Sequence, residues 1–284
     1  MFRKGVIFAA SVALGLTLAT LQVASEKAAL IPPRVAEQLP FSIGETLYYN
    51  ISYSKLIFSG TIGELKLTVS KPQDPSYSEM IELKADAVSK GFFPALFGVK
   101  VKDSYTSLVH VSDFGLHTTT KLLEEGKVRR EQKSVINREA GIVTYSDRDL
   151  ANPKSSPKIK EKPSPKWIQD LLSTIYFVRT QPLKEGDIIP VPISDGGEIY
   201  NIQVIAGKRE EIKSGGVAFK TIQLNAKVFD GSYIKRSGEM LVWVADDPTR
   251  LPIRARIKTS GATITVDLKR KAGKPAQALP TSTQ

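Results

Sequence analysis

Residues 236–268, RSGEMLVWVADDPTRLPIRARIKTSGATITVDL, have the pattern of three antiparallel strands joined by two turns. The segment 240–245 is a short apolar and aromatic run, typical of a buried strand. Asp246-Asp247-Pro248 ends it, because aspartate bonds to nearby backbone amides and proline fixes φ for a turn. In 252–258 isoleucine and alanine alternate with arginine and lysine, and Ser260-Gly261 then precedes the alternating segment 264–268. The stretch predicts a meander whose middle strand has one apolar and one basic face.

Similar alternation on both sides of this meander predicts a mainly β fold. Turn signals separate the predicted strands at 47–53, 60–69, 80–88, 101–110, 116–123, 127–137, 141–145, 188–193, 198–208 and 217–229. The segment 167–181 instead has apolar residues three and four apart, with Pro165 before it and Pro182 after it, and predicts an amphipathic helix. We therefore expect a large curved antiparallel sheet or open half-barrel, with one helix packed in its concavity.

The N-terminus has the layout of a secretory signal peptide over 1–25: Arg3 and Lys4 precede an apolar run, and small residues follow it. The alternative is an inner-membrane anchor through 6–23. We expect a flexible linker over 26–40, a single β-rich domain over 41–268 and a flexible tail over 269–284. Within the domain, 147–166 carries four prolines and five lysines and predicts a disordered basic insertion.

Composition limits the chemistry. The chain of 284 residues has no cysteine, which excludes disulfides, a thiolate nucleophile, cysteine-ligated zinc and a lipidated cysteine. Its formal net charge is +11, and loss of Arg3 and Lys4 with the signal, one positive charge each, would leave +9. A cationic exported protein would meet anionic envelope surfaces, with peripheral membrane contact, rather than nucleic acid.

The segment 91–98, GFFPALFG, is too short for a helix and too apolar for an ordinary exposed loop. It can be a hydrophobic plug that closes the core, or else a mobile lip at the mouth of a ligand cavity or a loop that touches a membrane. In the second interpretation the ligand-binding residues lie on this lip and along the helix: Phe92, Phe93, Leu96, Phe97, Trp167, Leu171 and Tyr176.

The chain resembles the bacterial family called domain of unknown function 3108. The resemblance covers about 41–268 and is carried by GETLYY at 44–49, Gly60, DLLS at 170–173, YFVR at 176–179, and Gly238 through Trp243, Asp246-Asp247 and RLPI at 250–253. It implies an exported protein with no established activity. It also implies a sheet similar to the open half-barrel of the lipoprotein carrier and receptor of the outer-membrane sorting pathway, an analogy of fold that does not transfer function.

No group of residues defines a catalytic or metal site. Asp246 and Asp247 could act as an acid and base pair, but their place beside Pro248 favours turn capping and ion pairing. His110 and His117 would face each other across a hairpin centred on 113–114, and two ligands alone make a weak metal site. Asp170, Ser173 and Arg179 are interpreted as polar contacts of the helix. We expect no cofactor.

Two basic clusters are candidates for contact with an anionic surface: Lys127, Arg129 and Arg130, and Arg254, Arg256 and Lys258. The hypothesis for function is a non-enzymatic envelope protein that binds a lipid or other amphiphile in an apolar groove between sheet and helix. The alternative is an envelope scaffold with a filled core that binds another envelope protein, and an envelope hydrolase is third.

Overall fold

The computed structural model describes residues 38–91, 98–152, 154–229, 231, 233–235 and 237–272, and the side chains as far as Lys269. Within these residues, one short 3₁₀ helix, η1 (Pro75–Tyr77), and one α-helix, α2 (Leu171–Arg179), accompany fourteen strands. The strands are β1 (Thr46–Lys55), β2 (Phe58–Ser70), β3 (Met80–Ser89), β4 (Lys102–His110), β5 (Leu116–Glu125), β6 (Val128–Asn137), β7 (Ile142–Asp149), β8 (Lys158–Pro163), β9 (Ile188–Asp195), β10 (Glu198–Ser214), β11 (Val217–Ala226), β12 (Gly238–Ala245), β13 (Pro252–Thr259) and β14 (Thr263–Ala272).

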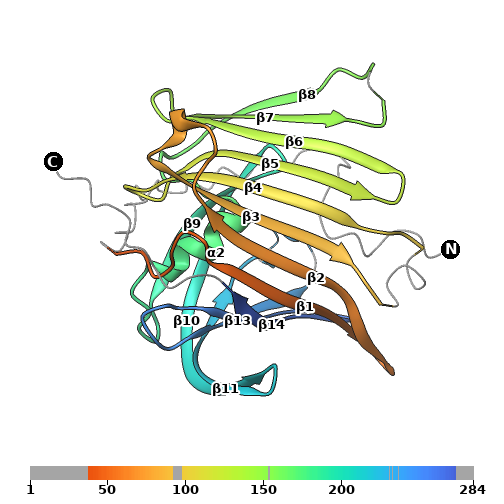
Figure 1. Cartoon of the computed structure of the whole chain (residues 1–284), viewed down its shortest axis with the longest axis vertical. Coiled ribbons are helices and arrows are strands. Elements are labelled where there is room, and N and C mark those ends of the chain that lie inside the picture. The colour runs from red at the N-terminus through yellow and green to blue at the C-terminus, as the bar shows by residue number, and fades with distance from the viewer. Residues whose placement is uncertain are drawn as a thin grey trace, which may run out of the picture.

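The fourteen described strands belong to a single antiparallel sheet, in the order β8-β7-β6-β5-β4-β3-β2-β1-β14-β13-β12-β11-β10-β9. The chain makes two meanders, β1–β8 and β9–β14, which join where β1 pairs with β14. The sheet is strongly curved and open, and α2 lies within its curve (Figure 1). The predicted mainly β fold, with a half-open sheet and a single helix, is confirmed.

Period-two alternation sets the inner face of the sheet. Leu47 and Tyr49 of β1, Leu67 and Val69 of β2, and Leu268 of β14 all point to the core. Helix α2 packs against β3, β4 and β9, and contributes Leu172, Tyr176, Phe177 and Val178 to the same core. The helix therefore fills one end of the concave face with closely packed side chains.

The helix is shorter than the sequence pattern predicts. It begins after Asp170, whose carboxylate accepts the backbone N–H of Ser173, while the Ser173 hydroxyl accepts the N–H of Asp170. This capping box starts the helix four residues after the predicted start at 167. Before it, Gln169 pairs with Ile193 of β9 and thereby covers the outer edge of that strand.

The prediction of a disordered insertion over 147–166 is wrong for β8. Residues 158–163 pair with β7 in register, from Ile142 opposite Pro163 to Asp147 opposite Lys158. Lysines and prolines belong to edge strands as much as to loops, because an edge strand leaves half of its backbone groups unpaired. The domain also extends past its predicted end, since β14 pairs with β1 as far as Ala272 opposite Thr46.

The two edges of the sheet approach each other through side chains rather than a backbone ladder. Lys160 and Lys162 of β8 form ion pairs with Glu198 of β10, at 2.9 and 3.1 Å. Gly197, in the β9–β10 turn, lies so close that an added Cβ would meet Lys160 Cδ and Tyr145 at 2.8 Å. We call this line of contacts the seam.

Candidate functional site

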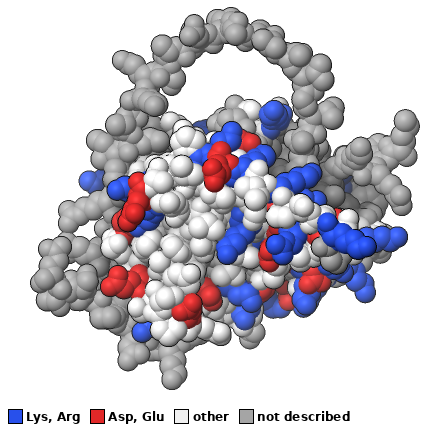
Figure 2. All heavy atoms as spheres, turned by 90° about the horizontal axis from the view of Figure 1, so that it is seen from above, with Lys and Arg blue, Asp and Glu red and all other residues white. Residues whose placement is uncertain are grey.

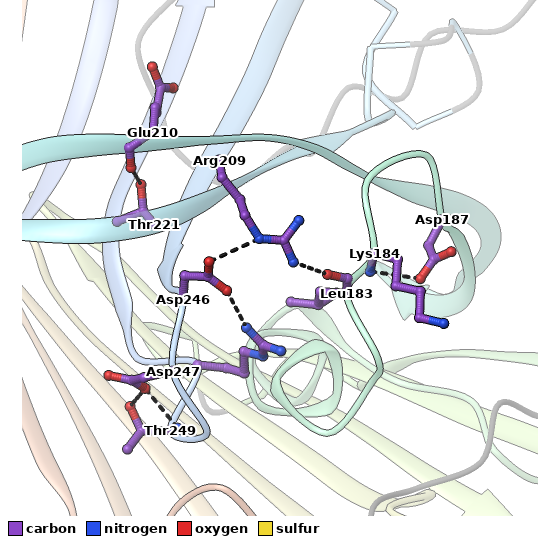
Figure 3. A network of polar contacts seen from close by, with 10 residues as sticks. Leu183, Lys184, Asp187, Arg209, Glu210, Thr221, Asp246, Asp247 and Thr249 are labelled. Atoms are coloured by element: carbon purple, nitrogen blue, oxygen red, sulfur yellow. Dashed lines mark hydrogen bonds and ion pairs between the residues drawn. The ribbon is translucent and has the colours of Figure 1, made fainter.

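Asp246 and Asp247 form the turn between β12 and β13. Asp247 accepts hydrogen bonds from the backbone N–H and the hydroxyl of Thr249, and Asp246 pairs with Arg209 and Arg250 at 2.9 and 3.1 Å (Figure 3). The carboxylate of Asp247 thus accepts hydrogen bonds within the turn, and that of Asp246 forms ion pairs. The predicted capping role is the one that the geometry supports.

His110 and His117 do lie beside each other, with ring centroids 5.6 Å apart, and Tyr77 stacks at 5.4 Å from His117. Burial, followed by the charge of Arg138, lowers the pKa of both imidazoles. Among the described residues, no three His, Cys, Asp or Glu side chains come together as a potential metal site.

Three of the predicted ligand-binding residues, Trp167, Leu171 and Tyr176, are among the described residues, and they do not line an open groove. Trp167 is 6% exposed and Tyr176 is fully buried, so both belong to the packed core, whereas Leu171 is 41% exposed on the outer side of the helix. The space between helix and sheet is filled by side chains. Phe92, Phe93, Leu96 and Phe97 lie outside the described residues.

Carboxylates partly neutralise the two basic clusters. Arg130 donates two hydrogen bonds to Asp147, and Arg254 pairs with Asp267 at 2.5 Å. Arg256 lies 4.8 Å above the ring of Trp243. Seen from above, charged side chains of both signs lie around a broad uncharged area, with basic ones frequent on the right (Figure 2). Contact with an anionic surface stays a prediction for both clusters.

A depression of about 530 Å³ crosses β1, β2, β3 and β14. Charged side chains of both signs line it, among them Glu64, Lys66, Asp86 and Lys269. Two of them are already paired, because Lys269 lies 3.3 Å from Glu64. Tyr48, Tyr49, Leu65 and Val88 supply the rest of its lining, so charged and apolar side chains are mixed in it rather than separated as in the mostly apolar pocket of a lipid site.

A buried ion pair joins three distant parts of the chain at the C-terminal end of α2. Arg179 pairs with Glu45 through both guanidinium NH groups, at 2.6 and 3.1 Å, and both side chains are at most 1% exposed. The same guanidinium donates to the carbonyl oxygens of Pro40 and Thr249 and lies 4.9 Å above the ring of Phe41. We call these contacts the arginine lock; it fixes the helix to the start of the domain and to the β12–β13 turn.

Beyond the helix, the concave face continues as two rows of apolar side chains. In each row the residues are register partners on β1, β14, β13, β12 and β11. Each of these residues is separated from a core residue of its own strand by an even number of positions. Because side chains alternate between the two faces of a strand, each therefore points to the concave face, as the core residues do. We call them the concave strip, whose members are Ile51, Val266, Ala255, Val242 and Leu224 in one row and Tyr53, Ile264, Ile257, Met240 and Ala226 in the other. All except Tyr53 and Leu224 are partly exposed.

Polar side chains occupy the concave face next to β4, β5 and β9. Lys121 of β5 forms an ion pair with Asp195 of β9, and each side chain is 13% exposed. The hydroxyl of Tyr233 donates to Asp195 at 3.0 Å, and Lys121 lies 5.6 Å above the ring of Tyr105. We call these four residues the inner polar cluster. Burial and then nearby carboxylates raise the pKa of both tyrosines, which are therefore neutral hydrogen-bonding groups.

Two carboxyl groups, Asp103 and Glu125, lie beside this cluster and are hydrogen-bonded to each other. Burial, followed by the charge of Asp103, raises the pKa of Glu125 to about 7. Burial also raises the pKa of Asp103, although the backbone N–H of Glu124 donates to it at 2.9 Å. Asp103 is the register partner of Ala87, which pairs with Leu65, so the sheet connects the carboxyl pair to the apolar part of the concave face.

We expect the protein to lose stability between about pH 4.5 and 7 because of Glu125. Its folded-state pKa is raised, so the folded chain holds a proton that the unfolded chain releases, and this stabilisation is lost as pH rises through about 7. The full pKa shift would change the free energy of unfolding by about 3 kcal/mol. Because Glu125 is only half-buried, solvent screening reduces the expected change to about 1 kcal/mol. Urea unfolding at pH 5 and 7.5 measures the difference.

Glu125→Gln should remove that difference, because glutamine does not titrate. Glu124→Gln is the matched control, since Glu124 is the sequence neighbour and its side chain is 43% exposed beside Arg129. Equal pH dependence in the two variants would contradict the assignment of the raised pKa to Glu125.

The sequence matches the family model "Protein of unknown function (DUF3108)" over residues 48–269. The chain belongs to the DUF3108 family. The arginine lock joins Arg179 and the 246–253 turn, which lie within the matched range, to Glu45, which precedes it. In this DUF3108 protein the lock holds the helix in the sheet.

One solved structure supports the fold of this DUF3108 protein. A β-barrel-like DUF1849 protein from Brucella abortus has a TM-score of 0.55 and 8% identity, covering 85% of this chain and 100% of that chain. A "putative exported protein with YmcC-like fold" from Bacteroides fragilis has a TM-score of 0.32, 10% identity and coverage of 84% and 99%. A "putative lipoprotein" from Parabacteroides distasonis has a TM-score of 0.29, 10% identity and coverage of 83% and 99%.

The comparison with curated proteins gives no match. In the part of the DUF3108 chain that the structure describes, no helix is long and apolar enough to cross a membrane.

Sequence reasoning missed the inner polar cluster and the carboxyl pair. The available signal was alternation: Asp103, Tyr105 and Ser107 share one face of β4, and Thr119, Lys121 and Glu125 share one face of β5. Both inner faces combine polar residues with apolar ones, so the pattern alone does not show which side is inside. Asp195 at the end of β9 and Tyr233 between β11 and β12 are distant in the sequence from β4 and β5, so only the fold could place them beside Lys121.

Proposed function

We propose that this DUF3108 protein is an exported, non-enzymatic binding protein of the cell envelope that holds an amphiphile against its concave face. The observation that carries the proposal is the concave strip, in which partly exposed apolar side chains lie in register across five adjacent strands. A monomeric soluble protein rarely leaves a contiguous apolar surface open without a ligand or partner for it. The apolar chain of the ligand would lie on this strip.

The polar head of the ligand would lie at the inner polar cluster. Lys121 and the two tyrosine hydroxyls can donate hydrogen bonds, and Asp195 and Asp103 can accept them. The cluster can therefore hold the carboxyl or hydroxyl head of an amphiphile, such as a fatty acid, through these hydrogen bonds.

A single substitution can fill the strip. Ala255 is its smallest central member, between Val266 and Val242, so we expect Ala255→Trp to lower the affinity for a fluorescent fatty acid about tenfold. Loss of contact with two methylene groups, at about 0.8 kcal/mol each, accounts for this factor. Thr265→Trp, on the opposite face of β14, is the matched control and should change the affinity less than about twofold.

Native mass spectrometry and lipid extraction after gentle purification provide the second measurement, and a co-purifying amphiphile is expected. A chain without bound amphiphile and without fatty-acid uptake would overturn the proposal. Uptake that begins only when Phe92, Phe93, Leu96 and Phe97 are replaced by serine would also overturn it, because the chain's own segment would then occupy the strip.

The alternative function, an envelope scaffold, is favoured by one observation: the space between α2 and the sheet is packed. A scaffold of this kind needs no ligand and would use its exposed strands to bind another envelope protein. The same lipid extraction distinguishes the two functions, because a scaffold would purify without a stoichiometric amphiphile.

A further inference from the structure

The hairpin between β1 and β2 ends in an exposed apolar tip. Lys55 pairs with Phe58, which leaves Leu56 and Ile57 as a two-residue loop. Leu56 is 93% exposed, Ile57 is 91% exposed and Phe58 is 60% exposed. The end of this hairpin projects at the lower right, clear of the neighbouring strands (Figure 1). We call Leu56, Ile57 and Phe58 the apolar tip.

The residues of this loop are not those that the turn itself favours. Two-residue hairpin loops prefer asparagine and glycine, because these tolerate positive φ, yet Leu56 has φ of 51°. The nearly complete exposure of Leu56 and Ile57 means that neither side chain gains stability by packing in the core. A sequence that breaks a local rule with no gain in folding points to a requirement outside the fold.

We propose that the apolar tip inserts into the interface of an anionic lipid bilayer. A narrow projection of consecutive leucine, isoleucine and phenylalanine can enter the boundary between headgroups and acyl chains without any rearrangement of the sheet. A protein partner would instead have to supply a pocket for all three side chains. This inference goes beyond the proposed function and stands without it.

The charge around the tip fits an anionic surface. Lys55 borders the tip directly and is exposed. Lys258 belongs to the same end of the sheet, because it pairs with Thr263, which pairs with Ser54. Glu239 lies opposite Lys258 on β12, so Lys55 is the cation that acts at the tip itself. Shallow apolar insertion with adjacent lysine provides the two signals that stable attachment to a membrane surface requires.

The absence of cysteine permits a direct test on the full chain. Ile57→Cys, labelled with the environment-sensitive fluorophore NBD, is mixed with vesicles of phosphatidylcholine and phosphatidylglycerol. We expect a blue shift of the NBD emission and quenching by lipids that carry a spin label on the acyl chain. Val217→Cys is the matched control, because Val217 is 55% exposed at the start of another hairpin strand, and its label should not change.

A second variant removes the apolar tip and improves the turn. Leu56→Asn with Ile57→Gly places the preferred turn residues in the loop, so the fold should be at least as stable as before. We expect its partition onto the anionic vesicles to fall about tenfold, the effect of about 1.4 kcal/mol. The wild-type chain and the variants have the same N-terminal segment, so any contribution of that segment to vesicle binding is the same in all of them. The difference in partition therefore measures the contribution of the apolar tip.

Three results would overturn the proposal. One is an unchanged emission of the NBD label at position 57 when the chain is bound to the vesicles. Another is equal partition of the wild-type chain and the Asn-Gly variant onto the vesicles. The third is a label that responds to a protein from the envelope fraction but not to vesicles of either lipid, because the tip would then be a protein-docking element. Failure of fatty-acid uptake in Ala255→Trp would leave all these measurements unaffected.

Discussion

Arg179→Met is expected to lower the free energy of unfolding by about 3–5 kcal/mol, because it leaves the carboxylate of Glu45 buried without its cation. The carbonyl oxygens of Pro40 and Thr249 would lose a donor in the same step. For a domain of this size, such a loss lowers Tm by about 10 °C or more. Urea and thermal unfolding measure it.

The double variant Arg179→Met with Glu45→Gln tests the origin of the loss. It should recover much of the stability, because two neutral side chains avoid the cost of burying a single charge. Arg250→Met is the control: Arg250 pairs with Asp246 at 3.1 Å but remains 22% exposed, so we expect less than about 1 kcal/mol. Strictly additive effects of the two lock substitutions would contradict the buried ion pair as the source.

Asp170→Ala is expected to cost a similar amount, about 3–5 kcal/mol, at the other end of the helix. The carboxylate of Asp170 is 2% exposed, caps the N–H of Ser173 at 2.6 Å and accepts hydrogen bonds from the hydroxyls of Ser107 and Thr119. Loss of the cap costs about 1 kcal/mol, and each buried hydroxyl without a partner costs about 1–3 kcal/mol. The urea midpoint of the variant measures the sum.

Asp74→Ala is the matched control for this prediction. Asp74 caps η1 through the same kind of bond, to the N–H of Ser76 at 2.9 Å, but it is fully exposed. Its replacement should leave the urea midpoint unchanged within error. Ser107→Ala and Thr119→Val should lower the stability less in the Asp170→Ala background than in the wild type, because their hydrogen bonds to Asp170 are then already lost. Equal losses of stability in the two backgrounds would contradict the contribution of these hydrogen bonds.

Local patterns predicted most of the fold because each strand has one face in the core. The alternation of Ile253, Ala255 and Ile257 with basic residues specifies a strand and its two faces before any partner is known. The strand β8 gave no such pattern, because Ile159 is its only large apolar residue and is 63% exposed. An edge strand of this kind is stabilised by its backbone pairing with β7.

The candidate site was less predictable than the fold. Tyr176 and Trp167 have the periodicity of a helix face, but periodicity cannot show whether that face lines a groove or fills it. The concave strip depends on the register of β1 with β14, strands separated by almost the whole domain. The apolar tip left a local signal, a leucine and an isoleucine where a turn was expected, and this signal became interpretable only with the exposure of both side chains.

The pairing of β1 with β14 places the first and last strands of the domain at the centre of the sheet. The hydroxyl of Ser52 reaches the carbonyl of Thr265, 213 residues away in the sequence, while the other ladders join consecutive strands. Each meander can form from local contacts, but the central ladder must wait for β14 and bears the entropy of closing the longest loop in the sheet. Until Thr263–Ala272 has been synthesised, β1 and β13 therefore present unpaired edges that can be bound by other chains. Completion of the fold is in this sense coupled to synthesis of its last strand, β14.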